Sequence, residues 1–199
     1  MFPWRIHSNG NFLVETEVRE SSVAGGGLGR FACEALRVGD IVRKSPLLDI
    51  SDFTSMNPPG HIPKDEDFAV VIKDVKDLEN WVEHFAVVAD KEEIRKMTSW
   101  FLAAVFQTGT HGKEPICFIH LHSFHANHRI PSNLCVCTEG SFLLVKAIAD
   151  IRVGDEFFTN YMDYPIDPVI AQWFASHGLT DVKTFAERSS VSPSVSGSH

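Results

Sequence analysis

The stretch Val145–Tyr161, VKAIADIRVGDEFFTNY, decides the fold prediction because it joins a strand-like run to a turn and a rare tyrosine. An apolar run at Phe142–Val145 leads into the stretch, and the turn follows at Asp150–Gly154. A second short run, Phe157–Thr159, ends just before Tyr161. The chain has 2 tyrosines against 15 phenylalanines, and a buried tyrosine needs a partner for its hydroxyl. We therefore expect Tyr161 to lie where its oxygen is used.

Size and charge indicate a single globular domain. The chain has 199 residues and a formal net charge of -8, so we predict one domain over residues 1–188 and a disordered, Ser-rich tail over residues 189–199. An acidic balance without a basic run argues against direct nucleic-acid binding and suits a basic peptide partner. The N-terminus lacks the apolar stretch of a signal peptide, and no run approaches the length of a membrane span.

The cysteine pattern indicates a reducing compartment. Cys33, Cys117, Cys135 and Cys137 show no CxxC spacing, so reduced thiols in the cytoplasm or nucleus are the simplest interpretation. We expect Cys135 and Cys137 to lie on one strand and to face opposite sides of it.

Periodicity predicts a mainly β, α+β chain with a helical insert. Apolar spacing predicts one helix through Leu78–Val88 and a second from Asp90 to Gly109, which together form an insert over about residues 75–110. A C-terminal helix is expected over residues 167–178, and residues 51–67 read as a surface connection. The predicted strands cover residues 11–19, 30–36, 40–50, 68–73, 117–124, 133–138 and 141–148.

Three patches carry a family resemblance. They are GGGLGRFA (Gly25–Ala32), NHRIPSN (Asn127–Asn133) and GDEFFTNY (Gly154–Tyr161). In this order and spacing they resemble the Gly-x-Gly turn, the Asn-His-Ser-Cys-x-Pro-Asn motif and the Gly-Glu-Glu-Leu-Thr-x-x-Tyr ending of SET domains. The resemblance covers roughly residues 11–164. It implies a SET-domain-like β-clip fold of several short sheets, of the small stand-alone type without a cysteine-rich post-SET segment.

The same resemblance implies a function and a set of site residues. The function is S-adenosylmethionine-dependent methyl transfer to a lysine side chain of a protein or peptide. Tyr161 is the implied catalytic residue, at the mouth between the cofactor and the lysine channel, and it also contacts the cofactor. The other implied cofactor-binding residues are Gly26, Gly27, Leu28, Gly29, Phe124, Asn127, His128 and Trp173. The three patches further predict that residues 127–133 thread beside residues 155–161, with Tyr161 close to Gly27.

The middle patch departs from the family pattern, and this leaves two alternatives open. Arg129–Ile130 stand where the family has Ser-Cys, and Pro131 lies one place early. The first alternative is a SET fold that lacks methyl transfer and binds peptides. The second is a repurposed enzyme that acts on a small molecule in the old pocket.

A histidine cluster offers a competing metal-binding hypothesis. His120, His122, His125 and His128 are closely spaced, and the first two would share one face of a strand. No fitting Asp or Glu lies within the cluster, and two of these histidines fall in the SET-like patch. The sequence therefore favours no metal site.

Overall fold

The computed structural model describes residues 11–24, 26–61, 68–86, 106–111, 114–120, 124–163 and 168–178. The strands are β1 (Thr16–Glu20), β2 (Leu28–Ala32), β3 (Ile41–Asp49), β4 (Ala69–Ile72), β5 (Phe106–His111), β6 (Glu114–His120), β7 (Asn127–His128), β8 (Leu134–Glu139), β9 (Phe142–Ala147) and β10 (Phe158–Thr159). The helices are α1 (Ile50–Met56), α2 (Val75–Ala86), the 3-10 turn η2 (Tyr161–Asp163) and α4 (Pro168–Ser176). The predicted mainly β, α+β class is confirmed.

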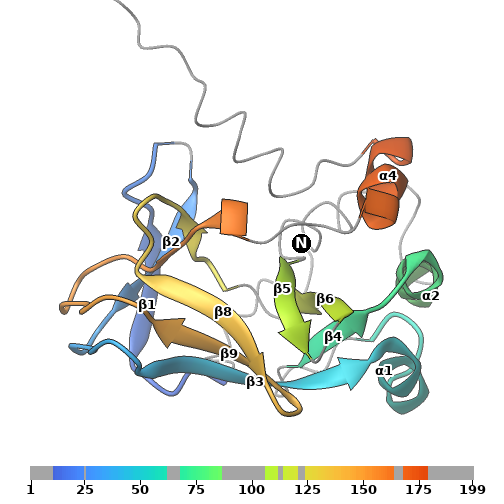
Figure 1. Ribbon diagram of the computed structural model, residues 1–199, viewed down its shortest axis with the longest axis horizontal. Coiled ribbons are helices and arrows are strands. Elements are labelled where there is room, and N and C mark those ends of the chain that lie inside the picture. Colours follow the sequence, from blue (N-terminus) through green and yellow to red (C-terminus); the bar gives the residue numbers. More distant parts are fainter. Residues whose placement is uncertain are drawn as a thin grey trace, which may run out of the picture.

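The strands form two sheets. β1 and β2 make an antiparallel pair, and the other strands form a mixed eight-stranded sheet in the order β5-β6-β4-β3-β9-β8-β10-β7. Within it, β3 pairs antiparallel with β9 and parallel with β4. The labelled helices lie at one side of the molecule, and β1 and β2 lie at the other (Figure 1). The glycine hairpin is therefore remote from α4.

The main core lies against the strands β3, β8 and β9. Leu134 and Val136 are buried on β8, while β9 buries three consecutive residues, Leu143–Val145. A strand that buries consecutive side chains is covered on both faces. Tyr161 is partly buried and packs against this core, so the predicted catalytic tyrosine is anchored at its edge.

The prediction for Cys135 and Cys137 was wrong. Both thiols are half-buried, and they alternate with the buried Leu134 and Val136. Side chains two positions apart on a strand share a face, so the two cysteines point to the same side of β8.

A second packed region holds the helices to the sheet. Phe53 of α1 is fully buried, and its ring lies 5.4 Å from that of Trp81 and 5.2 Å from that of His84, both on α2. Asp74 and Asp77 cap α2 reciprocally: Oδ1 of Asp74 accepts from the Asp77 amide, and Oδ2 of Asp77 accepts from the amide of the residue before Asp74. The predicted first helix of the insert is thereby confirmed.

Two predictions about elements need correction. Residues 51–67 were expected to be a surface connection, yet residues 50–56 form α1. Ile50 and Phe53 supply a buried face at helical spacing, and Asn57 closes the last turn by donating from its side chain to the Phe53 carbonyl at 2.9 Å. The second predicted helix was expected to end at Gly109, but Gly109 lies inside strand β5. The start of that helix, at Asp90, lies outside the described residues.

The other element predictions are largely confirmed, with shifts of a few residues. β3, β4, β8, β9 and α4 fall within the predicted ranges or shift by one residue at an end. β1 and β2 are shorter than the predicted strands over residues 11–19 and 30–36. The boundary of the domain at residue 188 and the tail lie outside the described residues. Among the described helices, none is long and apolar enough to cross a membrane.

Candidate functional site

The site is built where three distant segments meet. The amide of Phe157 donates to the Arg30 carbonyl at 2.8 Å, which lays residues 154–157 along β2. Phe158 pairs in parallel with Asn127, and the amide of Arg129 donates to the Thr159 carbonyl at 3.2 Å. The predicted threading of residues 127–133 beside residues 155–161 is therefore confirmed, whereas the closeness of Tyr161 to Gly27 stays a prediction.

Asn133 clamps the threaded segment. Its Nδ2 donates to the Glu156 carbonyl at 2.8 Å, and its Oδ1 accepts from the Phe158 amide at 2.8 Å. The side chain thus pairs with backbone groups on both sides of Phe157, as a neighbouring strand would. Because buried backbone groups need partners, Asn133 fixes the path that delivers Tyr161.

The glycine turn joins β1 to β2 as a closed loop. The amide of Ser21 donates to the Gly27 carbonyl at 2.9 Å, and the amide of Gly26 donates to the Val23 carbonyl at 2.9 Å. Gly27 has φ +65°, and a Cβ atom built on it would meet nothing within 4 Å. Leu28 is half-exposed. Among the described glycines of this turn, Gly27 is therefore the one at which the backbone borders open space.

The structure gives a different reason for a glycine at position 29 than the sequence suggested. A Cβ atom on Gly29 would collide with the side-chain carboxylate of Glu156. The close approach at this glycine is therefore to a residue of the same chain. It was expected to be an approach to a ligand.

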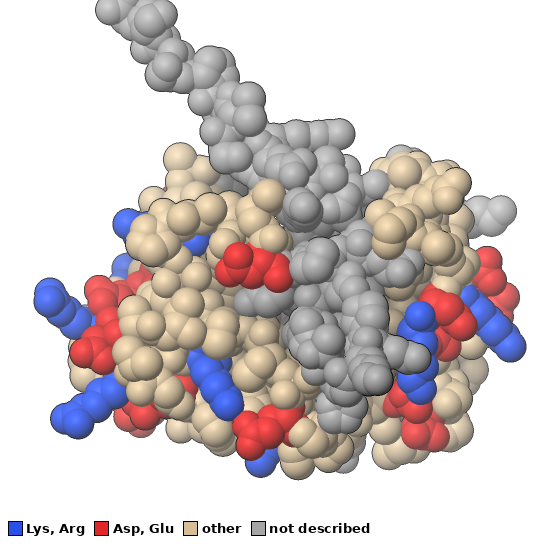
Figure 2. Space-filling model, viewed as in Figure 1, with Lys and Arg blue, Asp and Glu red and all other residues tan. Residues whose placement is uncertain are grey.

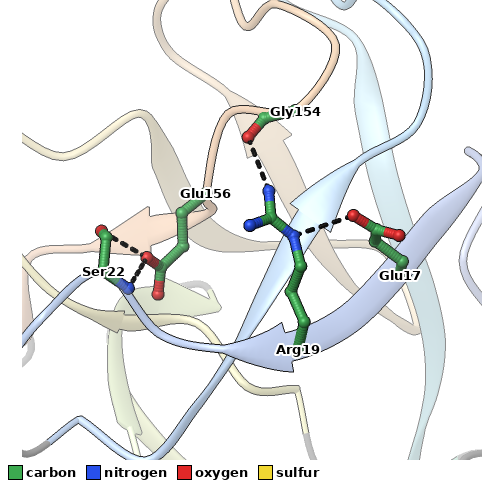
Figure 3. Close-up of polar contacts among 5 residues, drawn as sticks. All are labelled: Glu17, Arg19, Ser22, Gly154 and Glu156. Carbon is green, nitrogen blue, oxygen red and sulfur yellow. Dashed lines mark hydrogen bonds and ion pairs between the residues drawn. The ribbon is translucent and has the colours of Figure 1, made fainter.

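Glu156 is the central polar residue of the site, and the sequence interpretation missed it. Its side chain is only 5% exposed. Oε1 accepts from the Ser21 hydroxyl at 2.6 Å, and Oε2 accepts from the amide and hydroxyl of Ser22 at 2.8 and 2.6 Å. Figure 3 shows Ser22 and Glu156 turned toward each other across the hairpin. Burial alone would raise the pKa of Glu156, but the hydrogen bonds from Ser21, Ser22 and Asn127 outweigh it and hold the pKa below its ordinary value.

Asn127 completes this network. Its Nδ2 lies 3.0 Å from Oε1 of Glu156, 2.9 Å from Oγ of Ser21 and 3.1 Å from the Leu28 carbonyl. An ionised carboxylate and a carbonyl can only accept hydrogen bonds, so the nitrogen of the amide must be the atom that faces them. All the side-chain hydrogen bonds of Asn127 are made by Nδ2, and no donor among the described residues contacts its Oδ1.

Tyr161 and His128 form the second half of the site. The Tyr161 hydroxyl donates to the Ala126 carbonyl at 2.9 Å, and the Tyr161 amide donates to Nδ1 of His128 at 3.1 Å. The two rings lie 5.3 Å apart. Because Nδ1 accepts, the neutral imidazole carries its proton on Nε2. Burial raises the pKa of Tyr161 to about 12, so the hydroxyl is neutral near pH 7 and can orient a group but not act as a base.

Phe124 lies beneath the site as a core residue. Its side chain is 7% exposed, and its ring stacks on that of Phe12 with centroids 5.8 Å apart. The buried guanidinium of Arg30 lies 4.0 Å from the Phe12 ring centroid, and its Nε donates to the Phe124 carbonyl at 3.1 Å. Phe124 is therefore a core residue that supports β2 through its contacts with Phe12 and Arg30.

Arg19 fastens the outer side of the hairpin. Its guanidinium lies over the Phe31 ring, 3.4 Å from the centroid, and donates to the Gly154 carbonyl at 3.2 Å. Glu17 accepts from Nε of Arg19 at 2.8 Å (Figure 3). These contacts hold the turn before Glu156 against β1.

Trp173 is the predicted site residue that the structure sets apart from the others. It lies on α4, which packs against α2, at the side of the molecule opposite β2 (Figure 1). Its ring stacks on that of His177, with centroids 4.0 Å apart. Gly26–Gly29, Asn127, His128 and Tyr161 gather at the threaded segment, so the described arrangement gives Trp173 no contact with them.

The described residues give the metal-binding hypothesis no structural support. Among the described residues, no group of three or more histidine, cysteine, aspartate or glutamate side chains is placed to hold a metal ion. His122 and the side chain of His120 lie outside the described residues.

On the face shown in Figure 2, acidic and basic side chains are interspersed, and no broad patch of one sign is visible among the coloured residues.

Comparison with known proteins finds a distant structural likeness. No family profile and no curated protein matches the chain. The fold aligns with ctPRC2 in an autoinhibited conformation bound to S-adenosylmethionine, at 16% identity and a TM-score of 0.47, over 83% of this chain and 17% of that chain. It also aligns with Chaetomium thermophilum Polycomb Repressive Complex 2 bound to GSK126, at 16% identity and a TM-score of 0.46, over 81% of this chain and 17% of that chain.

A third alignment is to an active polycomb repressive complex 2 in the stimulated state, at 17% identity and a TM-score of 0.42, over 74% of this chain and 15% of that chain. The chain thus spans 15–17% of the length of these chains. Since the likeness is distant, a functional hypothesis has to rest on the residues of this chain.

Proposed function

We propose that this chain is a SET-type methyltransferase that transfers a methyl group from S-adenosylmethionine to a lysine side chain of a protein or peptide. The observation that carries the proposal is the pairing of β7 with β10. It sets Asn127 beside Phe158 and His128 beside Thr159, two residues before Tyr161. The cofactor-side asparagine and the tyrosine that the sequence singled out therefore share one short, hydrogen-bonded unit.

Two features of the site fit the amino-acid end of the cofactor. Oδ1 of Asn127 is held as an acceptor, which suits an ammonium group. The backbone of Gly27 borders open space, which suits the close approach of a ligand. When bound, S-adenosylmethionine supplies an electrophilic methyl group on a sulfonium.

The residues around Tyr161 suit alignment better than acid–base chemistry. The hydroxyl of Tyr161 is neutral near pH 7 and is fixed by its bond to the Ala126 carbonyl. Methyl transfer to an amine needs the reacting groups in line and the amine in its neutral form. A neutral hydroxyl and a backbone carbonyl can orient a lysine amine. An apolar surrounding lowers the pKa of that amine and favours loss of its proton.

Calorimetric titration with S-adenosylhomocysteine tests the proposal first, and radiolabelled methyl transfer to a library of basic peptides tests it second. We expect a heat of binding and label in one or more peptides. The absence of any heat at millimolar ligand would reject methyl transfer.

A peptide-binding module without methyl transfer is the second candidate, because Arg129 and Ile130 replace the family's Ser-Cys. Ile130 is 67% exposed on the threaded segment, so its apolar side chain is accessible to a bound peptide. Peptide binding without S-adenosylhomocysteine binding would favour this candidate.

A further inference from the structure

The Asn127 amide is held by a carboxylate that is itself fully occupied. Glu156 receives hydrogen bonds from the Ser21 hydroxyl, the Ser22 hydroxyl, the Ser22 amide and Nδ2 of Asn127. An ionised carboxylate offers about four lone-pair sites, and these donors fill them. Glu156 therefore has no free acceptor for a ligand, and its effect on a ligand must pass through Asn127.

The two oxygens of Glu156 have different neighbours. Oε1 faces Ser21 and Asn127, whereas Oε2 faces only Ser22. Ser21 is central because its hydroxyl donates to Oε1 and accepts from Nδ2 of Asn127. With the Leu28 carbonyl on the same side of the amide, a flip of Asn127 would place Oδ1 against two groups that can only accept, Oε1 of Glu156 and the Leu28 carbonyl.

We propose that Glu156 is a positioning residue, which fixes the Asn127 amide so that Oδ1 is presented to the ammonium group of the ligand's amino-acid end. This inference rests on the proposed function and names the residue that orients Asn127, which in turn recognises one charged group of the ligand. The negative charge of Glu156 is the element that matters. A neutral amide at this position carries an NH₂ group of its own, and facing that donor the Asn127 amide no longer has one preferred orientation.

The test pairs the loss of the residue with the loss of the ligand group. Binding of S-adenosylhomocysteine and of its analogue without the α-amino group is measured by calorimetry for the wild type, Glu156→Gln and Asn127→Ala. Loss of one hydrogen bond to a charged group costs about 1.5–3 kcal/mol, so the wild type should bind the amine-bearing ligand roughly ten- to a hundredfold more tightly. In Glu156→Gln and in Asn127→Ala the affinities for the two ligands should lie within about threefold of each other, because the site no longer recognises the amine.

Ser21→Ala and Ser22→Ala form a matched pair within the same network, and Glu139→Gln is a surface control. Ser21→Ala should reduce the discrimination between the two ligands, because Ser21 contacts both Glu156 and Asn127. Ser22→Ala should preserve it, because Ser22 contacts only the far oxygen of Glu156. Glu139 is exposed at the end of β8 and pairs with Lys146, so Glu139→Gln should match the wild type. If Glu156→Gln fails to fold, the serine pair decides the outcome.

Three results would overturn the inference in distinguishable ways. A wild type that binds neither ligand rejects the proposed function together with this role of Glu156. A wild type that binds both ligands equally shows that Asn127 does not read the ammonium. Discrimination that persists in Glu156→Gln shows that the carboxylate does not set the orientation of Asn127, while leaving the proposed function intact.

Discussion

The carboxylate of Glu156 fills the space beside Gly29 in which a Cβ atom would otherwise lie. Gly29 pairs with Arg19 in the β1–β2 ladder, so its backbone has an ordinary strand role. The glycine is required here because the two segments approach closely across the site. This contact joins the first patch of the sequence to the last, since the two residues are more than a hundred positions apart along the chain.

Gly29→Ala should destabilise the protein by about 1–3 kcal/mol, because the added methyl group collides with the buried carboxylate. In a Glu156→Ala background the obstacle is gone. The same change should then be neutral or stabilising by up to about 1 kcal/mol, since alanine restricts the unfolded chain. Urea denaturation of the four proteins in this cycle measures both effects. Equal costs of Gly29→Ala in the two backgrounds would show that Glu156 is not the obstacle.

The sequence predicted the elements of the site because local patterns encode them. The apolar runs around Phe142–Val145 and Phe157–Thr159 formed strands, and Tyr161 follows them with its hydroxyl bonded to the Ala126 carbonyl. Local pattern also contained the signal for α1, since Ile50 and Phe53 are three residues apart and Asn57 precedes two prolines. The prolines and acidic residues of the same region favoured a loop interpretation and hid that signal.

The role of Glu156 could not be predicted because its partners are remote in sequence. Glu156 follows the exposed Asp155 after a turn, so the sequence suggests that both carboxylates face the solvent. Ser21 and Ser22 read as loop residues beside the glycines. The carboxylate of Glu156 is buried because residues 154–157 pair with β2, and the local sequence pattern does not predict that pairing.

Thr159→Val should stabilise the protein by about 1–3 kcal/mol, because Thr159 is a buried residue whose hydroxyl has no hydrogen-bond partner among the described residues. Valine keeps the branched shape that suits the strand. Thr159→Ser is the matched control; it keeps the hydroxyl, removes the methyl group and should destabilise. Melting temperatures of the three proteins give the answer. A loss of stability in Thr159→Val would indicate that the hydroxyl has a partner such as an ordered water molecule.

Acidification should weaken the packing of α2 through His84. Burial lowers the pKa of this imidazole, whose Nε2 lies 3.4 Å from the His61 carbonyl. A base with a lowered folded-state pKa binds fewer protons than in the unfolded chain, so stability is complete above the unfolded pKa of about 6.5 and falls as the pH drops toward and through the folded pKa.

His84→Gln removes that titration and keeps a polar group near the His61 carbonyl. Urea midpoints at pH 7.5, 6.5 and 5.5 should fall more steeply for the wild type than for His84→Gln. The difference between the two slopes is the quantity that reports on His84. Parallel slopes would contradict the prediction.

Tyr161→Phe tests the proposed chemistry, because it removes one oxygen and keeps the ring that packs between His128 and the core. The Ala126 carbonyl loses a donor, so stability should fall by only about 0.5–1.5 kcal/mol. If the hydroxyl orients the reacting groups mainly in the transition state, turnover should fall ten- to a thousandfold, or about 1.4–4 kcal/mol, with S-adenosylhomocysteine affinity almost unchanged. Radiolabelled methyl transfer and calorimetry on the same preparations separate these effects.

Since the pKa of Tyr161 is about 12, any rise in wild-type activity between pH 7 and pH 9 belongs to another group and should persist in Tyr161→Phe. Equal turnover in the two proteins would reduce Tyr161 to a packed tyrosine that supports the Ala126 carbonyl.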